Sequence, residues 1–283
     1  MKIAVSIVFY NPLKENTEQI KDYLSFFDLV IVIDNSNSEC SEVARLAVKN
    51  NHLLYLPLFQ NRGIAYALNK ALEEAEDKGC DFLLTMDQDS KYPFDKHKMI
   101  LNKLSAVNWD NTAIYAMLPQ KEYEKQNTFG IEQVTTAITS GNFINLRLIK
   151  KYNISFSSPL FIDCVDFEFD RLIIRKGLNI LQDNGICFKH SIGNPIRKKI
   201  FGKKFYCRNH SPVRYYYRFR NITYLINKDK EFYQKIYFKT RVIDFWKRIF
   251  FEPNKKSKLK RIRQGIKDAK KNVLGPFVAD SKK

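Results

Sequence analysis

The sequence predicts an α/β fold with a mostly parallel central sheet flanked by helices. In the first half of the chain, short apolar runs alternate with amphipathic stretches. The apolar runs have the length and residue types of strands, and they are Ile3–Phe9, Leu29–Ile33, Leu53–Pro57, Phe82–Met86 and Ile114–Leu118. The stretches with helical spacing are Glu15–Phe26, Ser41–Asn50 and Ile64–Lys78. Strands that alternate with helices favour right-handed crossovers, which place consecutive strands parallel to one another.

The pattern changes near residue 190, where a basic and aromatic-rich region with helical spacing begins. Residues 191–283 hold 27 Lys and Arg against 6 Asp and Glu, so this region carries the whole positive surplus of a chain with a net charge of +18. We expect residues 1–190 to form the sheet domain and residues 191–283 to form a helical region that completes its site. The charge favours an anionic partner, which is a phospholipid surface, a lipid pyrophosphate or a nucleic acid.

Two stretches of the basic region carry an apolar stripe at helical spacing. The stripe residues are Phe232, Ile236, Ile243, Trp246 and Phe250 in the first stretch, and Leu259, Ile262, Ile266, Ala269 and Val273 in the second. Lys and Arg residues lie off the second stripe. One interpretation is a helix on an anionic membrane surface, and the other is a helix that packs on its own domain with a solvated basic face. The sequence leaves both open.

The cysteines and the apolar runs indicate a reducing, cytoplasmic setting. Five cysteines are scattered without a C-x-x-C pair, which argues against a disulfide framework and a zinc cage. No apolar run approaches the length of about 18 residues that a transmembrane helix needs. The first apolar run is broken at Asn11-Pro12 and lacks a small-residue cleavage site, so we expect no signal peptide.

Polar residues follow each of the first four apolar runs. In a parallel sheet the ligand lies at the carboxyl ends of the strands, so these positions bear most on function. They are Tyr10-Asn11, Asp34-Asn35-Ser36, Gln60-Asn61-Arg62-Gly63 and Asp87-Gln88-Asp89-Ser90. Each group alone is ordinary turn or helix-cap chemistry. Four such groups in order predict that they converge on one polar rim.

Asp87 and Asp89 are the most informative pair on this rim. They follow an apolar run directly and are separated by one residue. Two carboxylates held this close repel each other unless a cation lies between them. Mg²⁺ and Mn²⁺ are hard ions that bind carboxylate and phosphate oxygens. The pair therefore predicts a metal and phosphate site, with a solvated turn as the alternative.

Two further segments carry candidate chemistry and a plain structural alternative. Gly63 opens a helix, where backbone N–H groups and the helix dipole favour a phosphate, and Asn61 adds an amide. A tightly packed helix is the alternative.

Residues 158–177 contain four acids close together, which are Asp163, Asp166, Glu168 and Asp170. Crowding raises carboxyl pKa values and suits one acid to act as a general base, whereas ion pairs with Arg171 or Arg175 are the alternative.

A fourth segment follows His190 and mixes arginines with aromatic residues. Its members are Arg214, Tyr215, Tyr216, Tyr217, Arg218, Arg220 and Asn221. Arginines beside aromatic rings grip a diphosphate, stack on a base or bind nucleic acid. The residue types alone do not choose among these ligands.

Taken in order, these segments resemble family 2 of the inverting glycosyltransferases, and within it the bacterial rhamnosyltransferase branch. The resemblance spans nearly the whole chain through VSIVFYNP, VIVIDNSNS, NRGIAYALNKALEEA, FLLTMDQDS, ITSGNFI, LFIDCVDFEFD with RKG, KHSIG and RYYYRFRN. The branch rests on DQDS, FID-x-VD-x-E and R-x-Y-Y-x-x-R-N.

The resemblance implies a GT-A fold, which is Rossmann-like, a nucleoside-diphosphate-sugar donor, and Mg²⁺ or Mn²⁺ held through the D-x-D motif. It implies Asp166 as the catalytic base, and Asp87, Asp89 and His190 as the metal residues. The residues implied at the nucleotide sugar are Tyr10, Asp34, Asn61, Gly63, Asp87, Ser140, Gly141, Arg214 and Arg220. Where the family carries an arginine this chain has Leu172, so either Arg171 substitutes or that contact is absent.

We expect an enzyme that moves L-rhamnose from dTDP-rhamnose onto a lipid-linked or polysaccharide acceptor of a surface glycan, such as O-antigen or capsule. Another donor such as a UDP-hexose is the alternative. The basic region predicts peripheral binding at the inner face of the cell membrane. A nucleotidyltransferase would carry a Gly-rich, Lys-containing loop in place of Phe9-Tyr10-Asn11-Pro12. A nucleic-acid-binding protein would leave the acidic rim unexplained, so we expect no nucleic-acid partner.

Overall fold

The computed structural model describes residues 1–120, 130–190, 196–200, 203–207, 209–240, 245 and 251–278. The chain divides into two compact units. The first comprises Met1–Ser157 and Asp166–Ser191, and the second comprises Ser158–Val165 and Ile192–Lys283. The short segment that precedes Asp166 therefore belongs to the second unit, although Asp166 itself belongs to the first.

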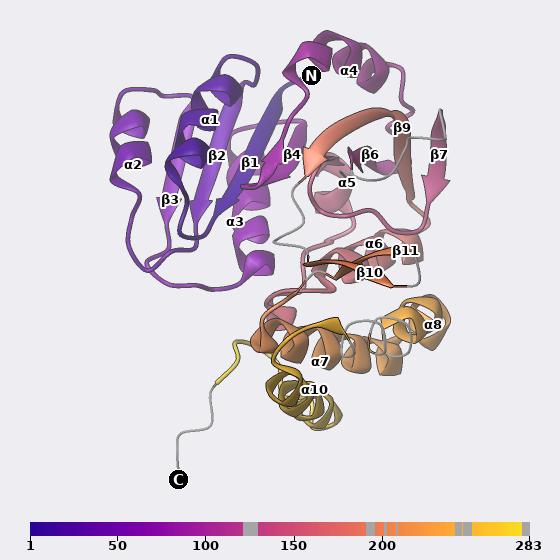
Figure 1. Ribbon diagram of the computed structural model, residues 1–283. Coiled ribbons are helices and arrows are strands. Elements are labelled where there is room, and N and C mark those ends of the chain that lie inside the picture. The colour runs from indigo at the N-terminus through magenta and orange to yellow at the C-terminus, as the bar shows by residue number, and fades with distance from the viewer. Residues whose placement is uncertain are drawn as a thin grey trace. The chain divides into compact units, whose positions relative to one another are not determined.

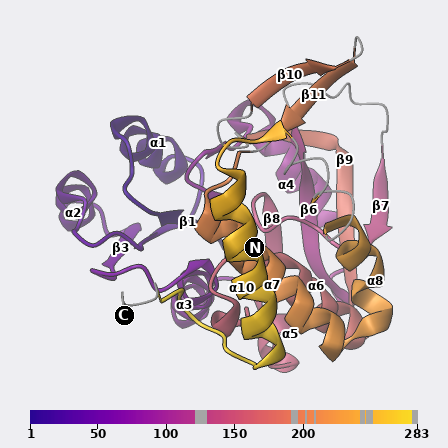
Figure 2. The same cartoon turned by 60° about the horizontal axis from the view of Figure 1, so that its bottom comes forward.

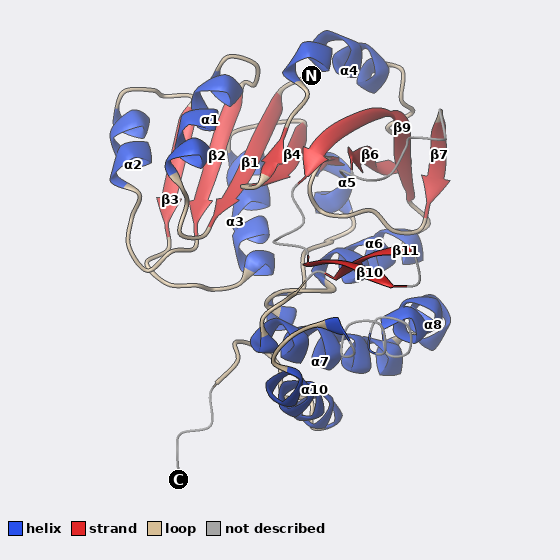
Figure 3. Ribbon diagram, in the orientation of Figure 1, coloured by secondary structure: helices blue, strands red, loops and turns tan. Residues whose placement is uncertain are grey.

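Four parallel strands form one half of the sheet in the first unit (Figures 1 and 3). They are β1 (Ile3–Phe9), β2 (Leu29–Asp34), β3 (Leu53–Pro57) and β4 (Phe82–Asp87), in the spatial order β3-β2-β1-β4. The predicted strands are confirmed here to within one residue at each end. Every residue of β1 and β2 is buried, as expected for strands that are covered on both faces.

The sheet becomes mixed beyond β4. β8 (Asn142–Asn145) pairs antiparallel with both β4 and β6 (Thr112–Gln120), and β9 (Asn179–His190) runs parallel to β6. Two short strands, β5 (Ser90–Lys91) and β7 (Ile131–Val134), are antiparallel to β9. The expected parallel arrangement thus holds for β1 to β4, and the sheet as a whole is mixed. An antiparallel neighbour needs no crossover helix, and β8 indeed enters the sheet from a loop.

Helices pack on this sheet through two separate sets of side chains. The helices α1 (Lys14–Leu24), α2 (Ser41–Val48) and α4 (His97–Ser105) share one apolar cluster with alternate residues of β1 and β2. The helix α3 (Ile64–Asp77) lies against β1, β2 and β4 with its small side chains buried. The small residues Ala65, Ala67, Ala71 and Ala75 allow this close approach of helix to sheet. The first unit also contains α5 (Leu146–Lys151) and, from Asp166 on, α6 (Val165–Arg175).

The second unit contains strands that the sequence did not predict. An antiparallel pair, β10 (Ile196–Ile200) and β11 (Lys203–Cys207), lies in the region that we expected to be helical. The helices described in this unit are α7 (Pro212–Lys228), α8 (Lys230–Phe238) and α10 (Lys255–Lys270). The expectation of helices is therefore confirmed for these segments, and it is corrected for the strand pair that precedes them.

The helix α10 lies alongside α7 (Figures 1 and 2). A Cβ atom added at Gly265 would lie 2.5 Å from the Tyr216 carbonyl oxygen, so the absence of a side chain brings the two helices together. Ile262 and Ala269 are buried in the same interface. Ile262 and Ala269 of the second apolar stripe thus pack on their own domain, as the second interpretation expects, whereas Val273 is 49% exposed.

The first apolar stripe is described only in part. Phe232 and Ile236 lie in α8, whereas Ile243, Trp246 and Phe250 fall outside the described residues. Among the helices that the structure describes, none combines the length and the apolar content that crossing a membrane requires.

A buried carboxylate couples the stability of the first unit to pH. Asp183 is fully buried and accepts hydrogen bonds from Lys103 Nζ (2.6 Å), the Tyr115 hydroxyl and the Gly185 N–H (2.8 Å). Burial alone would raise the pKa of Asp183, but these bonds outweigh it and hold the pKa below its ordinary value. Asp183→Asn is therefore expected to lower the free energy of unfolding by about 2 kcal/mol at pH 7.

The pH dependence gives this prediction its sign. A depressed carboxyl pKa stabilises the fold above the unfolded-state value of about 3.9, and that stabilisation is lost as the pH falls through the folded-state value. In urea unfolding, the difference in the free energy of unfolding between the wild type and Asp183→Asn should therefore become smaller below about pH 4. The matched control is Asp110→Asn, because Asp110 is 90% exposed and its pair with Arg147 contributes little. If this difference in the free energy of unfolding did not change with pH, the depressed pKa of Asp183 would be contradicted.

Candidate active site at the carboxyl edge of the sheet

The loops that follow β1, β2 and β4 are joined by hydrogen bonds. The Tyr10 N–H donates to Gln88 Oε1 (2.8 Å), and Gln88 Nε2 donates to the Tyr10 carbonyl (3.3 Å). The Asn11 N–H donates to Ser36 Oγ (2.7 Å). The predicted polar rim is therefore one connected surface. Gln88, the middle residue of the D-x-D triplet, joins the loops after β1 and β4 through both of its bonds to Tyr10. The sequence did not indicate this role.

Asp34 is a fixed acceptor at the end of β2. Its side chain is 1% exposed and accepts hydrogen bonds from the Ser36 N–H (2.9 Å) and the Tyr55 hydroxyl (2.7 Å). Burial, and then the bond to Asp34, raise the pKa of Tyr55, so this hydroxyl stays a donor at neutral pH. The predicted contact of Asp34 with the nucleotide stays a prediction.

The turn after β3 is held by two asparagines. Asn61 Oδ1 accepts from the Gly63 N–H (2.9 Å), and Asn35 accepts from the Arg62 N–H (3.1 Å) while it donates to the Gly63 carbonyl (3.1 Å). Gly63 has φ of 87°, a backbone conformation that favours glycine. Asn61 and Gly63 thus form the start of α3 at the rim. Asn35, which follows β2, joins the end of that strand to the start of α3. In the sequence, only its position after a strand indicated a role for Asn35.

Asp87, Asp89 and His190 come together at the rim. Each offers one ligand atom, and these atoms lie within 4.8 Å of one another. Asp87 ends β4 and His190 ends β9, and the pairing of Ser90 with His190 between β5 and β9 brings the histidine beside the acidic pair. Asp89 Oδ1 lies 3.8 Å from His190 Nδ1. The predicted metal residues are thus neighbours, although His190 is about a hundred positions from the two aspartates in the sequence.

A chain of hydrogen bonds sets the geometry of this cluster. The Asp87 N–H donates to Ser140 Oγ (3.1 Å), and Ser140 Oγ donates to Ser90 Oγ (2.9 Å). Ser90 Oγ in turn bonds His190 Nδ1 (2.8 Å). Such outer partners orient metal-binding side chains in proteins. Ser140, predicted at the nucleotide sugar, therefore also supports the cluster, and Ser90 is a supporting residue that the DQDS motif contained.

Gly141 allows β9 to approach the cluster closely. A Cβ atom at this position would lie 2.4 Å from the Phe188 ring, and the backbone has φ of 84°. Phe188 lies two residues before His190 on the same strand. Gly141 thus keeps the end of β9 in place, and its predicted contact with the nucleotide sugar stays a prediction.

The donor set of the cluster fits a divalent cation. Two carboxylates and one imidazole suit Mn²⁺, and Mg²⁺ binds through carboxylates together with substrate phosphates. Asp89 is 47% exposed, so the cluster is open to a ligand. The remaining coordination positions of such an ion would fall to oxygen atoms of a bound diphosphate or of water.

Asp166 lies in the first turn of α6, beside a buried ion pair. Glu168 accepts two hydrogen bonds from the Arg171 guanidinium, at 2.8 and 3.1 Å, and both side chains are nearly buried. The salt-bridge interpretation is confirmed for Glu168. Arg171, the residue considered as a substitute for the arginine that the family carries at Leu172, thus pairs with Glu168 within its own helix.

Asp170, one turn after Asp166, is a structural carboxyl. It is 1% exposed and accepts a hydrogen bond from the Ala137 N–H (2.8 Å), which fastens α6 to the loop that leads to Ser140. Burial, and then the charge of Asp166, raise the pKa of Asp170 well above its ordinary value. The raised pKa expected for this acidic segment is thus found at Asp170.

Arg220, predicted at the nucleotide sugar, lies in the interior of the second unit. Its side chain is fully buried, and its guanidinium donates to the carbonyls of Pro159 (3.3 Å), Leu160 (3.0 Å) and Gly275 (2.6 Å). It also lies over the rings of Tyr216 and Tyr217. These contacts account for the arginine by packing, so we leave Arg220 out of the proposed site.

Asn221 and Arg214 act on the same segment. Asn221 Nδ2 donates to the carbonyls of Leu160, Ile162 and Asp163 at 2.9, 2.8 and 2.8 Å, and Arg214 Nε pairs with Asp163 (3.1 Å). The segment is strained, because Phe161, Asp163 and Cys164 have φ of 67°, 63° and 62°. The second unit therefore holds the strained chain that leads into α6. A contact of Arg214 with a diphosphate stays a prediction.

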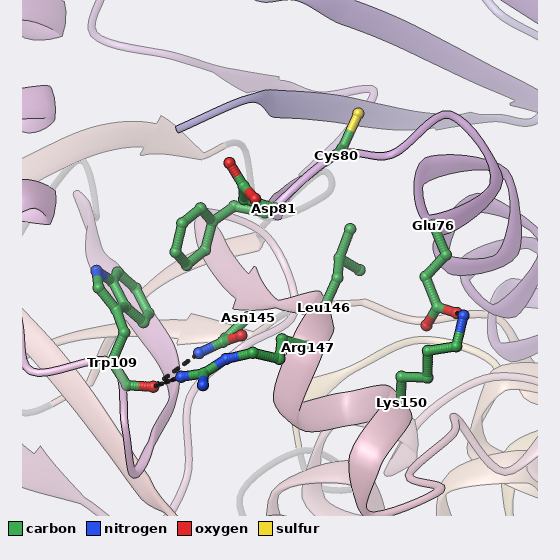
Figure 4. Close-up of a pocket in the computed structure, with 9 residues that line it drawn as sticks. Glu76, Cys80, Asp81, Trp109, Asn145, Leu146, Arg147 and Lys150 are labelled. Carbon is green, nitrogen blue, oxygen red and sulfur yellow. Dashed lines mark hydrogen bonds and ion pairs between the residues drawn. The ribbon is translucent and has the colours of Figure 1, made fainter.

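A pocket of about 310 Å³ lies at the other end of β4 from Asp87 (Figure 4). Its lining comes from the end of α3, the start of β4, Trp109, the end of β8 and α5. Its cations have partners, since Lys150 pairs with Glu76 (3.4 Å) and Arg147 donates to the Trp109 carbonyl (3.1 Å). The candidate chemistry is therefore at the rim and not in this pocket.

Known proteins resemble this chain in sequence and in structure. The dTDP-rhamnosyl transferase RfbF of Shigella flexneri is 26% identical over 248 residues, which are 80% of each chain. The structure of S. aureus TarS 1-349 has a TM-score of 0.55 at 15% identity and covers 95% of this chain and 71% of its own. GalNAc-T7 with UDP, GalNAc and Mn²⁺ has a TM-score of 0.59 at 12% identity, with 96% and 57% covered.

The two structures are GT-A glycosyltransferases, and at these identities they bear on the fold alone. The fold of this chain is accordingly the predicted GT-A fold. The sequence profile described as "Glycosyl transferase family 2" matches residues 5–161, more than half of the chain, and the protein belongs to this family.

Proposed function

We propose that this glycosyltransferase moves L-rhamnose from dTDP-rhamnose onto a lipid-linked or polysaccharide acceptor of a bacterial surface glycan, such as O-antigen or capsule. The cluster of Asp87, Asp89 and His190 carries the proposal, because a nucleoside diphosphate is a ligand that suits such a site. The similarity to a dTDP-rhamnosyl transferase supports the choice of sugar. A UDP-hexose donor is the alternative.

In this proposal the rim binds the donor and α6 supplies the base. Asp87, Asp89 and His190 would hold Mg²⁺ or Mn²⁺, which neutralises charge on the diphosphate. Tyr10, Asp34, Asn61, Gly63, Ser140 and Gly141 line the region proposed for the nucleotide sugar. Tyr10 is 48% exposed, so its ring is available to a ligand.

Asp166 is the proposed general base. It takes the proton of an acceptor hydroxyl, whose oxygen attacks the anomeric carbon as the bond from that carbon to the diphosphate breaks. The nucleoside diphosphate leaves with the bonding electrons, and the anomeric configuration is inverted. Asp166 lies in the first turn of α6, near the positive end of the helix dipole.

We place the protein in the cytoplasm, at the inner face of the cell membrane, where a lipid-linked acceptor would be available. The surplus of Lys and Arg after residue 190 supports this placement.

A donor panel tests the proposal. The purified protein is incubated with dTDP-rhamnose, UDP-glucose and UDP-N-acetylgalactosamine, with Mg²⁺, with Mn²⁺ or with chelator, and release of nucleoside diphosphate is measured. We expect turnover to be highest with dTDP-rhamnose and to stop when the metal is chelated. If only a UDP-hexose were turned over, dTDP-rhamnose would be rejected as the donor. If turnover continued in the presence of chelator, the proposed metal dependence would be rejected.

A further inference from the structure

The helix α10 has two opposite faces of different chemistry. Its buried residues recur at intervals of four, three and four, and they are Lys258, Ile262, Gly265 and Ala269. Five exposed cations recur at intervals of four, three, four and three, and they are Lys256, Lys260, Arg263, Lys267 and Lys270. With 3.6 residues per turn, these two sets lie on opposite sides of the helix. We call the five exposed residues the α10 cation row.

The acids near this helix do not neutralise the row. Residues 251–278 hold nine Lys and Arg but two acids, Glu252 and Asp268. Glu252 is buried and accepts from Lys258 Nζ (2.8 Å) and the Tyr215 hydroxyl (2.8 Å), and Asp268 accepts from the Tyr216 hydroxyl (2.9 Å). Among the described residues, no member of the row forms an ion pair. Its charge therefore faces solvent.

We infer that the α10 cation row docks on an anionic phospholipid surface. The row spans about 21 Å along one straight helix, because each residue advances the axis by about 1.5 Å. A convex line of this length meets several headgroups of a flat bilayer at once, and each Lys or Arg near such a surface adds to binding. The inference deepens the proposed function, since it names the face that would turn toward a lipid-linked acceptor.

The structure favours electrostatic docking over insertion into the bilayer. A helix that inserts needs a free apolar face. In α10 that face packs on α7, through Ile262, Gly265 and Ala269. Binding by charge alone should be screened by salt, because the Debye length falls to about 3 Å at 1 M ionic strength.

The row also differs from a surface for single-stranded nucleic acid. Such surfaces interleave cations with aromatic rings on which bases stack. The α10 cation row contains no aromatic residue, and the nearby Phe277 ring is covered by the Arg261 guanidinium at 4.5 Å. The row thus offers cations that contact phosphate groups and no aromatic ring on which a base would stack.

The test is vesicle co-sedimentation of the full chain, with vesicles of pure phosphatidylcholine and with vesicles of about one third phosphatidylglycerol. We expect binding to the anionic vesicles, and release at high salt. The triple variant Lys260→Gln, Arg263→Gln and Lys267→Gln should bind about a hundred-fold more weakly, since each cation contributes about a five-fold factor.

The matched control removes the same charge from the first unit through Lys21→Gln, Lys49→Gln and Lys98→Gln, all at exposed positions, and should lose much less binding. Equal losses in both variants, or binding that survives high salt, would overturn the inference, as would tighter binding to single-stranded RNA. Binding is scored without turnover. If the wild-type protein does not bind anionic vesicles but turns over the donor, the docking face alone is rejected. If it binds these vesicles but turns over no donor, the transferase proposal alone is rejected.

Discussion

Replacing Asp166 with asparagine is expected to lower kcat by about 10²- to 10⁴-fold, the range over which a positioned general base accelerates a reaction. Asparagine has nearly the same shape but does not accept the proton of an acceptor hydroxyl. Affinity for metal and donor should change little, because Asp87, Asp89 and His190 are untouched. Steady-state kinetics with acceptor, together with calorimetric titration of the donor, would separate these two effects.

The matched control is the same substitution one turn later. Asp170 is buried with a raised pKa, so its neutral form is favoured, and asparagine keeps an oxygen to accept from the Ala137 N–H. Asp170→Asn should therefore retain activity within several-fold. It should also lessen any loss of stability with rising pH, because an acid with a raised folded-state pKa destabilises the fold as it ionises. Equal loss of activity in the two variants would contradict the assignment of Asp166 as base.

The sequence sufficed for the part of the fold that local pattern determines. The strands β1 to β4 are short apolar runs between helices, and their boundaries follow from residue type. The strands β5 and β8 have two and four residues, and their pairing depends on partners far along the chain. A periodicity argument has no access to such partners. The apolar run Ile114–Leu118 did predict β6 (Thr112–Gln120), but the strand pairing in the mixed half of the sheet was not predictable from local pattern.

The site shows the same division. The D-x-D motif identified Asp87 and Asp89, and the resemblance supplied His190, but the hydrogen bonds that join them through Ser140 and Ser90 exist only in three dimensions. Arg220 shows what the sequence does not reveal. The resemblance implied a contact with the nucleotide sugar, whereas in the structure the guanidinium donates to backbone carbonyls of Pro159 and Leu160. Burial decides between these roles, and burial of an arginine is not visible in sequence.

Replacing Asp89 with alanine is expected to lower turnover by about a thousand-fold at a fixed metal concentration, since a bound cation stabilises developing charge by several kcal/mol. The same change should weaken Mn²⁺ binding, which the signal of free Mn²⁺ in electron paramagnetic resonance reports independently of activity. Ser90→Ala should have a smaller effect, about 10- to 100-fold in metal affinity, because Ser90 orients His190 and is not itself one of the three cluster residues.

Two comparisons make this prediction specific to the cluster. Asp95→Ala removes an exposed carboxylate from the neighbouring turn, Phe94–Lys96, and should leave Mn²⁺ binding as in the wild type. Without metal, Asp89→Ala should unfold no earlier than the wild type, since it relieves the repulsion between two neighbouring carboxylates. An Asp89→Ala protein that folds normally and binds Mn²⁺ with wild-type affinity would rule out the cluster as the metal site. A graded loss from Asp95→Ala through Ser90→Ala to Asp89→Ala would instead place the ion between the ends of β4 and β9.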